Sequence, residues 1–192
     1  MKKLILVLNV FAISTATVNA QGTTNFGIKA GITSANLKFS GSGVSVSADS
    51  KIGFYGGVFA QIGVSENFAV QPEVLYSLLG SKSQGDNLNL SYVSVPVLAK
   101  YIKEGLSIVL GPQVSVLVSA QDKSDGGGDV KDQFKSTEIA GVIGAGYTLT
   151  NGFGFDARYQ LGLSDIAKGS DLEAVKVKSN AFMVGVHYRF HK

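Results

Sequence analysis

Hydrophobic and polar residues alternate along most of the chain beyond residue 20. In two neighbouring segments, the residues of one parity are apolar: Phe68, Val70, Val74, Tyr76 and Leu78, then Val93, Val95, Val97, Ala99 and Tyr101. The other parity carries polar residues that include Gln71, Glu73, Ser94 and Lys100. Successive side chains of a β-strand point to opposite faces, so this pattern predicts two strands with one apolar and one polar face.

Similar alternation recurs along the chain and predicts about eight strands. The segments are 26–32, 52–64, 68–78, 93–101, 106–118, 139–147, 153–161 and 182–190. Short turns at 65–67, 103–105 and 150–152 alternate with polar loops at 40–50, 80–90, 120–135 and 164–178. The segments are near the ~9–11 residues of a tilted membrane strand. We therefore expect an all-β fold, an eight-stranded antiparallel up-and-down transmembrane β-barrel with short periplasmic turns and longer extracellular loops.

The composition agrees with many closely packed strands in one domain. The chain has 192 residues, of which 24 are glycine and 16% are charged, and it contains neither cysteine nor tryptophan. This length suits a single domain. Without cysteine, an exported chain must be stable without disulfides.

Residues 1–20 have the composition of a cleaved signal peptide. Lys2 and Lys3 precede an apolar run, and small residues precede an expected cut between Ala20 and Gln21. The run is shorter than the ~20 residues of a spanning helix. The domain would then be residues 21–192, and its charge would be 15 basic (17 − 2) against 14 acidic residues, or +1. This balance does not indicate binding to nucleic acid.

The polar face of the predicted barrel carries charged residues of both signs. The candidate lumen network consists of Lys29, Lys100, Arg158 and Arg189 with Glu73, Glu138 and Asp156. Eight strands enclose only enough space for side chains, so we expect these groups to pair and plug the barrel. A gated path for protons or ions is the alternative. A register shifted by one residue would turn the four cations toward lipid, at ~2–4 kcal/mol each near the midplane.

Three prolines lie inside predicted strands, where each removes a hydrogen-bond donor of the ladder. Pro72, Pro96 and Pro112 fall at similar heights on adjacent strands. They predict either one connected seam, with a local bulge or weakened pairing, or three separate tolerated bulges.

Evidence for metal, cofactor or catalytic chemistry is weak. The acidic loop Asp122–Asp129 could offer oxygen ligands to calcium, but its spacing differs from the EF-hand pattern and favours a solvated loop. Gly144-Ala145-Gly146 lacks the lysine and helix of a phosphate loop and suits small inward-facing positions. His187 and His191 lie at the periplasmic rim, and no Ser/His/Asp set can be placed on one rim. We therefore expect no cofactor and no enzymatic activity.

Several short sequence motifs resemble those of the PorT-like outer-membrane β-barrel family of the Bacteroidota. They are Gln71–Ser77, Tyr92–Tyr101, Gly111-Pro112, Asp156–Tyr159 and the aromatic ending Tyr188-Arg189-Phe190. The resemblance implies an eight-stranded barrel in the outer membrane of a Gram-negative cell, and one family member is tied to protein secretion. Many relatives carry an acid where this chain has Ser94, so the expected partner of Lys100 is missing.

The aromatic ending also implies a partner in biogenesis. A terminal aromatic is the usual signal for the barrel-assembly machinery, and Tyr188 and Phe190 are the candidates here. The chain continues past them with His191 and Lys192.

Three hypotheses for function remain open. The first is a structural or partner-binding role in the cell envelope, with the four long loops as contact sites and an accessory role in protein secretion. The second is a narrow channel for small solutes or ions. The third is a ligand-binding barrel like a lipocalin, which would have its apolar residues inside.

Overall fold

Strands make up most of the part of the chain that the structure describes. The computed structural model describes residues 23–41, 44–47, 51–83, 86–122, 128, 135–164 and 176–190. The strands are β1 (Thr24–Gly41), β2 (Val44–Ser47), β3 (Lys51–Gly63), β4 (Phe68–Ser83), β5 (Asp86–Lys103), β6 (Leu106–Asp122), β7 (Thr137–Thr148), β8 (Phe153–Gly162) and β9 (Lys176–Arg189). Within these ranges, no helix has both the length and the hydropathy to span a bilayer.

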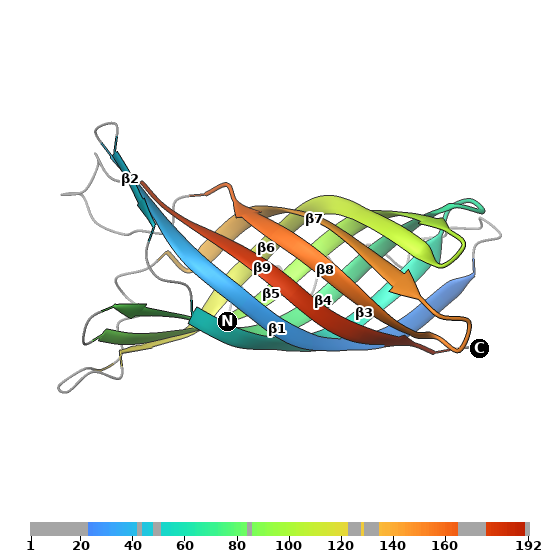
Figure 1. Cartoon of the computed structure of the whole chain (residues 1–192), viewed down its shortest axis with the longest axis horizontal. Helices are drawn as coiled ribbons and strands as arrows, with labels where there is room; N and C mark the ends of the chain where they lie inside the picture. Colours follow the sequence, from blue (N-terminus) through green and yellow to red (C-terminus); the bar gives the residue numbers. More distant parts are fainter. Residues whose placement is uncertain are drawn as a thin grey trace.

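Eight of the strands close into a barrel (Figure 1). Each strand from β3 to β9 pairs antiparallel with the next, β1 pairs with β3, and β9 returns to pair with β1. The β1–β9 pairing extends from Gly27↔Arg189 to Ser40↔Lys176. This closure leaves no open edge within the barrel wall, and it confirms the predicted eight-stranded antiparallel up-and-down barrel.

All the short turns lie at one end of the barrel, which we call the short-turn rim. They are residues 64–67, 104–105 and 149–152, close to the predicted positions. Glu104 and Gly105 have φ values of 51° and 84°, the left-handed pair that a two-residue hairpin turn favours. The first and last strands meet at the same rim, where Phe190 N donates to Phe26 O at 2.8 Å. The opposite end is the long-loop rim.

Strands continue into two of the predicted long loops, so the predicted extents of these loops are wrong. The expected loop 40–50 contains β2, which forms a hairpin with the end of β1. The expected loop 80–90 is mostly strand, because β4 reaches Ser83 and β5 begins at Asp86. Short alternating runs such as Val44–Ser47 and Asn87–Leu90 do occur there, but the serine, glycine and charged residues around them favour a loop interpretation. Figure 1 shows both extensions projecting past the barrel.

The outer face of the barrel is apolar and carries two groups of aromatic residues. The first group lies near the short-turn rim: Phe26, Phe68, Tyr101, Tyr147, Phe153, Phe155, Tyr188 and Phe190. The second lies further along the strands: Phe54, Tyr76, Tyr159 and Phe182. Phe182 and Phe190 are eight residues apart, which spans about 20 Å on a tilted strand. This approaches the ~25 Å apolar band, with an aromatic girdle at each interface, of outer-membrane barrels.

The inner face carries the polar residues, which contradicts the lipocalin-like alternative. Apolar side chains also reach inside, from positions that the alternation of the strands places on the inner face. They form three small clusters: Leu90, Tyr92, Leu117 and Ala120; Tyr55, Leu75 and Met183; and Leu98, Val109 and Val142. The lumen is therefore filled by a mixed core rather than by charges alone.

The three prolines lie on adjacent strands, as the seam hypothesis requires. Pro72 on β4 is paired one position away from Pro96 on β5, and Pro96 is paired one position away from Pro112 on β6. Cross-strand pairing is interrupted beside each proline, but the register is the same on both sides. The expected bulge at the prolines is therefore wrong. The register shift between β5 and β6 lies instead at residues 91–92 of β5.

Candidate functional site

A buried carboxylate on one wall of the barrel meets an arginine from the opposite wall. Glu73 on β4 accepts hydrogen bonds from Arg158 on β8, with Nη1 to Oε2 at 2.8 Å and Nη2 to Oε1 at 3.0 Å. Gln71 Nε2 donates to the same Oε1 at 2.6 Å. Because β4 and β8 are diametrically opposed in the strand order, this bidentate pair crosses the lumen.

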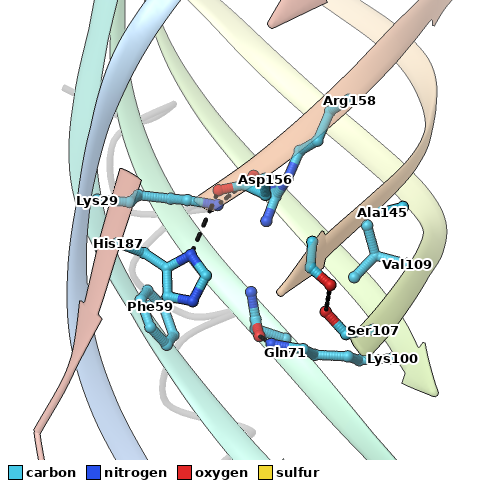
Figure 2. A pocket seen from close by; sticks show the side chains of 11 residues that line it. Lys29, Phe59, Gln71, Lys100, Ser107, Val109, Ala145, Asp156, Arg158 and His187 are labelled. Carbon is cyan, nitrogen blue, oxygen red and sulfur yellow. Dashed lines mark hydrogen bonds and ion pairs between the residues drawn. The ribbon is translucent and has the colours of Figure 1, made fainter. Parts of the chain in front are cut away.

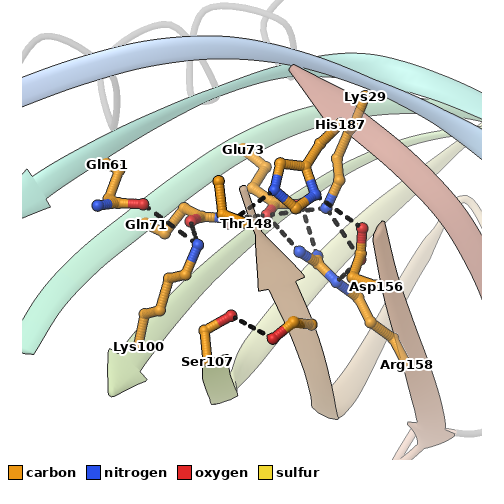
Figure 3. A network of polar contacts seen from close by, with 11 residues as sticks. Lys29, Gln61, Gln71, Glu73, Lys100, Ser107, Thr148, Asp156, Arg158 and His187 are labelled. Carbon is orange, nitrogen blue, oxygen red and sulfur yellow. Dashed lines mark hydrogen bonds and ion pairs between the residues drawn. The ribbon is translucent and has the colours of Figure 1, made fainter. Parts of the chain in front are cut away.

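A second cation and a second carboxylate complete the cluster. Lys29 Nζ on β1 lies 3.4 Å from Glu73 Oε1 and 3.3 Å from Asp156 Oδ1. Asp156 Oδ1 also lies 2.6 Å from Arg158 Nε. Figure 3 shows these side chains converging from β1, β4 and β8. Two cations thus balance two carboxylates in a buried group, which we call the ionic plug: Lys29, Glu73, Asp156 and Arg158.

Glycines on the neighbouring strand make room for the plug. A Cβ atom at Gly144 on β7 would lie 2.7 Å from the Cγ of Arg158, and one at Gly146 would lie 2.9 Å from the Cβ of Asp156. Both distances are too short for real side chains. The Gly144-Ala145-Gly146 segment therefore has a packing role, as the sequence analysis expected of small inward-facing positions.

An imidazole connects the plug to the short-turn rim. His187 Nδ1 on β9 lies 3.5 Å from Asp156 Oδ2, and its Nε2 lies 3.0 Å from the hydroxyl of Thr148. The ring of Phe59 packs edge-on against it, with the centroids 6.0 Å apart.

This row of hydroxyl, imidazole and carboxylate was not predicted, because Thr148 carries no pattern that marks it in the sequence. The three groups have the hydroxyl–imidazole–carboxylate order of a nucleophilic triad, but their other contacts differ from those of a triad. Asp156 already pairs with both cations of the plug. The backbone N–H of Thr148 donates to Gly105 O and is therefore not a donor for an oxyanion. The arrangement orients His187 within the lumen.

Lys100 lies beside the plug but is bound by neutral groups. Its Nζ donates to Gln61 Oε1 at 3.2 Å and to Gln71 Oε1 at 3.0 Å. Ser94, at the position where the resemblance suggests an acid, bonds Ser115 instead, with 2.9 Å between the hydroxyl oxygens. Within the described residues, no carboxylate lies within ion-pair distance of Lys100.

The two remaining members of the predicted network lie apart from the plug. Glu138 is buried near the long-loop rim, with Gln160 and Tyr92 as its electrostatic neighbours. Neither of its oxygens accepts a well-aligned hydrogen bond within the described part of the chain. Arg189 is half-buried at the short-turn rim, and its Nε likewise has no hydrogen-bond partner within the described residues. The structure therefore brings together Lys29, Glu73, Asp156 and Arg158, and leaves Glu138 and Arg189 outside this cluster.

The space beside the plug is very small. A cavity of about 10 Å³ is lined by all plug residues except Glu73 and also by Phe59 and His187 (Figure 2). This volume only approaches the ~10–15 Å³ that one water needs. A wider cavity of about 300 Å³ opens at the short-turn rim and reaches Lys100 and Arg189.

Other predicted positions have separate locations. The rings of Tyr188 and Phe190 lie 5.6 Å apart on the outer face. Ala20 and Gln21, His191, and most of the acidic loop between Asp122 and Asp129 fall outside the described residues. Within the described ranges, no three His, Cys, Asp or Glu side chains are grouped as metal ligands.

Removal of Glu73 should destabilise the barrel strongly. Glu73→Ala leaves Lys29 and Arg158 buried with only Asp156 between them, and breaking a buried pair in this way costs about 3–5 kcal/mol. Unfolding by urea in lipid vesicles measures this loss. Glu66→Ala, at an exposed turn position, is the matched control and should stay within about 0.5 kcal/mol of wild type. Equal effects of the two substitutions would contradict a stabilising role for the plug.

Comparisons with known protein structures agree with the barrel fold. Neisserial surface protein A (NspA) has a similar structure, with a TM-score of 0.60 and 21% identity over 88% of this chain and 99% of that chain. Ail, the attachment invasion locus protein of Yersinia pestis, gives a TM-score of 0.52 and 21% identity over 86% of this chain and 98% of that chain. These likenesses show a shared fold.

The sequence comparisons give the family. No curated protein sequence matches the chain significantly. The model of the family described as "Outer membrane protein beta-barrel domain" matches residues 19–168. This match covers most of the chain, including every plug residue. The closed barrel, its apolar outer face and this match lead to one conclusion: the chain belongs to the outer membrane protein beta-barrel domain family, and it is an outer-membrane protein.

Proposed function

We propose that this protein is a plugged outer-membrane barrel with a structural or partner-binding role in the envelope of a Gram-negative cell. The observation that carries the proposal is the bidentate Glu73–Arg158 pair, which crosses the lumen between opposite walls. Lys29 and Asp156 reinforce it from two directions. A solute would have to separate these buried charges to pass, so the barrel serves as a rigid support.

The projecting strand ends supply the surface for partners. Among the described strands, β2 is the terminal one and pairs with β1 alone, so its other edge offers backbone groups to a partner strand. The β4–β5 hairpin also projects from the long-loop rim, up to residues 83 and 86 (Figure 1). The resemblance to the PorT-like family of the Bacteroidota supports an accessory role in protein secretion.

The same proposal includes the route to the membrane. Residues 1–20 act as a signal peptide cleaved between Ala20 and Gln21. Tyr188 and Phe190 lie on the lipid-facing side of the last strand, where the barrel-assembly machinery would read them. The short turns then face the periplasm and the long loops face outward, as in other barrels of this class.

A narrow channel for small solutes or ions is the second candidate. The cavity of about 300 Å³ at the short-turn rim favours it, because it extends inward as far as Lys100. A complete path would still require the ionic plug to open.

Conductance separates the two candidates. We expect wild-type protein in planar bilayers to show no steady single-channel current, because the plug and the inward apolar clusters fill the lumen. Glu73→Ala should also give no measurable current, since these clusters remain when one carboxylate is removed. A steady current from the wild type would contradict the plugged barrel and support the channel.

Site-specific crosslinking tests the partner-binding surface. The chain has no cysteine, so Ser47→Cys on β2 and Ser83→Cys at the end of β4 each introduce a unique thiol. We expect both to crosslink in intact cells to the same envelope proteins, identified by mass spectrometry. Ser65→Cys, at the short-turn rim, is the matched control and should not capture these proteins. Identical products from all three positions, or none from the first two, would contradict the proposed surface.

A further inference from the structure

The lumen opens at the short-turn rim, and we call this opening the short-turn mouth. Within the described residues, the cations of the lumen that no carboxylate pairs with lie at this mouth. The ionic plug is neutral, because Lys29 and Arg158 balance Glu73 and Asp156. Lys100 and Arg189 are additional to this balance, and both line the same cavity at the short-turn rim. Two like charges held together in a protein are stabilised by an anion between them.

Both cations retain donors for such an anion. An ammonium group has three N–H donors, and Lys100 uses two of them for the oxygens of Gln61 and Gln71. A guanidinium has five, and the half-buried side chain of Arg189 lines the cavity, with a buried Nε that has no hydrogen-bond partner within the described residues. The backbone N–H of Arg189 donates to Gly152 O, which fixes the start of its side chain at the rim.

The cavity between these two residues has room for a polyatomic ion. Its volume of about 300 Å³ is many times the ~10–15 Å³ that one water requires. Lys100, Arg189, Gln61 and Thr148 contribute polar groups to its lining. Glu104 also lines it from the adjoining turn, so the cavity has two cations against one carboxylate.

From this arrangement we infer that the short-turn mouth is a binding site for a phosphate group, either the free ion or a phosphate monoester, held by Lys100 and Arg189. Arginine presents a planar set of donors that matches phosphate oxygens, and lysine adds a point charge. The ionic plug lies further inside, beyond Lys100, and prevents passage deeper into the barrel. In the proposed orientation, the site faces the periplasm.

Titration calorimetry tests the site on the folded full chain in uncharged maltoside micelles. Inorganic phosphate should bind the wild type against a constant chloride background, and Lys100→Met and Arg189→Met should each weaken binding at least tenfold. Lys103→Met is the matched control, because this exposed lysine lies near the mouth but outside the lining; its affinity should equal that of wild type. Glu104→Gln should bind more tightly, since it removes the opposing carboxylate.

Two comparisons make the test decisive. Tighter binding of glycerol 3-phosphate than of inorganic phosphate would identify a monoester as the ligand, whereas equal or weaker binding would identify the free ion. If Lys100→Met does not fold, Arg189→Met and Glu104→Gln still test the site, because both residues lie at the rim outside the plug. Absence of phosphate binding to the wild type at millimolar concentration, or equal affinity in all variants, would overturn the inference and leave the plugged barrel intact.

Discussion

Hydrocarbon excludes ionised side chains, and the structure of this protein depends on how its closed wall meets that constraint. Apolar residues of one parity face outward on every strand of the barrel, and charged residues of the other parity face the axis. Closure between β1 and β9 gives every strand of the wall a partner on both sides, as a membrane barrel requires. Inside, the cations of Lys29 and Arg158 meet the carboxylates of Glu73 and Asp156. The same closure therefore produces both the apolar exterior and the buried plug.

The charges of the lumen are arranged unequally along the barrel axis. A neutral cluster occupies the interior, Glu138 lies toward the long-loop rim, and Lys100 and Arg189 lie at the short-turn mouth. Three clusters of inward-facing apolar side chains share this interior. This arrangement suits a barrel whose interior is structural and whose two ends are available for binding.

Much of the fold could be predicted from the sequence, because lipid imposes a strict period of two. The eight strands, the short turns and the inward orientation of Lys29 and Arg158 follow from that alternation alone. The full length of some strands, such as residues 79–83 of β4, could not be predicted because glycine, serine and lysine there favour a loop interpretation. The inward positions of Leu98 and Leu117 agree with the alternation, although an apolar residue by itself is compatible with either face.

The partners of each charge could not be predicted in the same way. Pairing across the lumen depends on the stagger between strands, which places Glu73 against Arg158 although 85 residues separate them. The sequence suggested one network of seven residues, whereas the structure groups four of them. Lys100 was expected to lack a carboxylate partner, because Ser94 stands where many relatives have an acid. In the structure its Nζ donates to two glutamine oxygens instead.

Tryptophan fluorescence in bilayers of brominated lipid tests the orientation of the wall most directly. The chain has no tryptophan, and β3 offers a matched pair, Phe54 with 63% of its surface exposed and Phe59 with 4%. Phe54→Trp should be quenched strongly by the brominated chains, and Phe59→Trp should be quenched weakly. Strong quenching at position 59 with little at position 54 would contradict the account, because it would place the charged face of the strand against lipid.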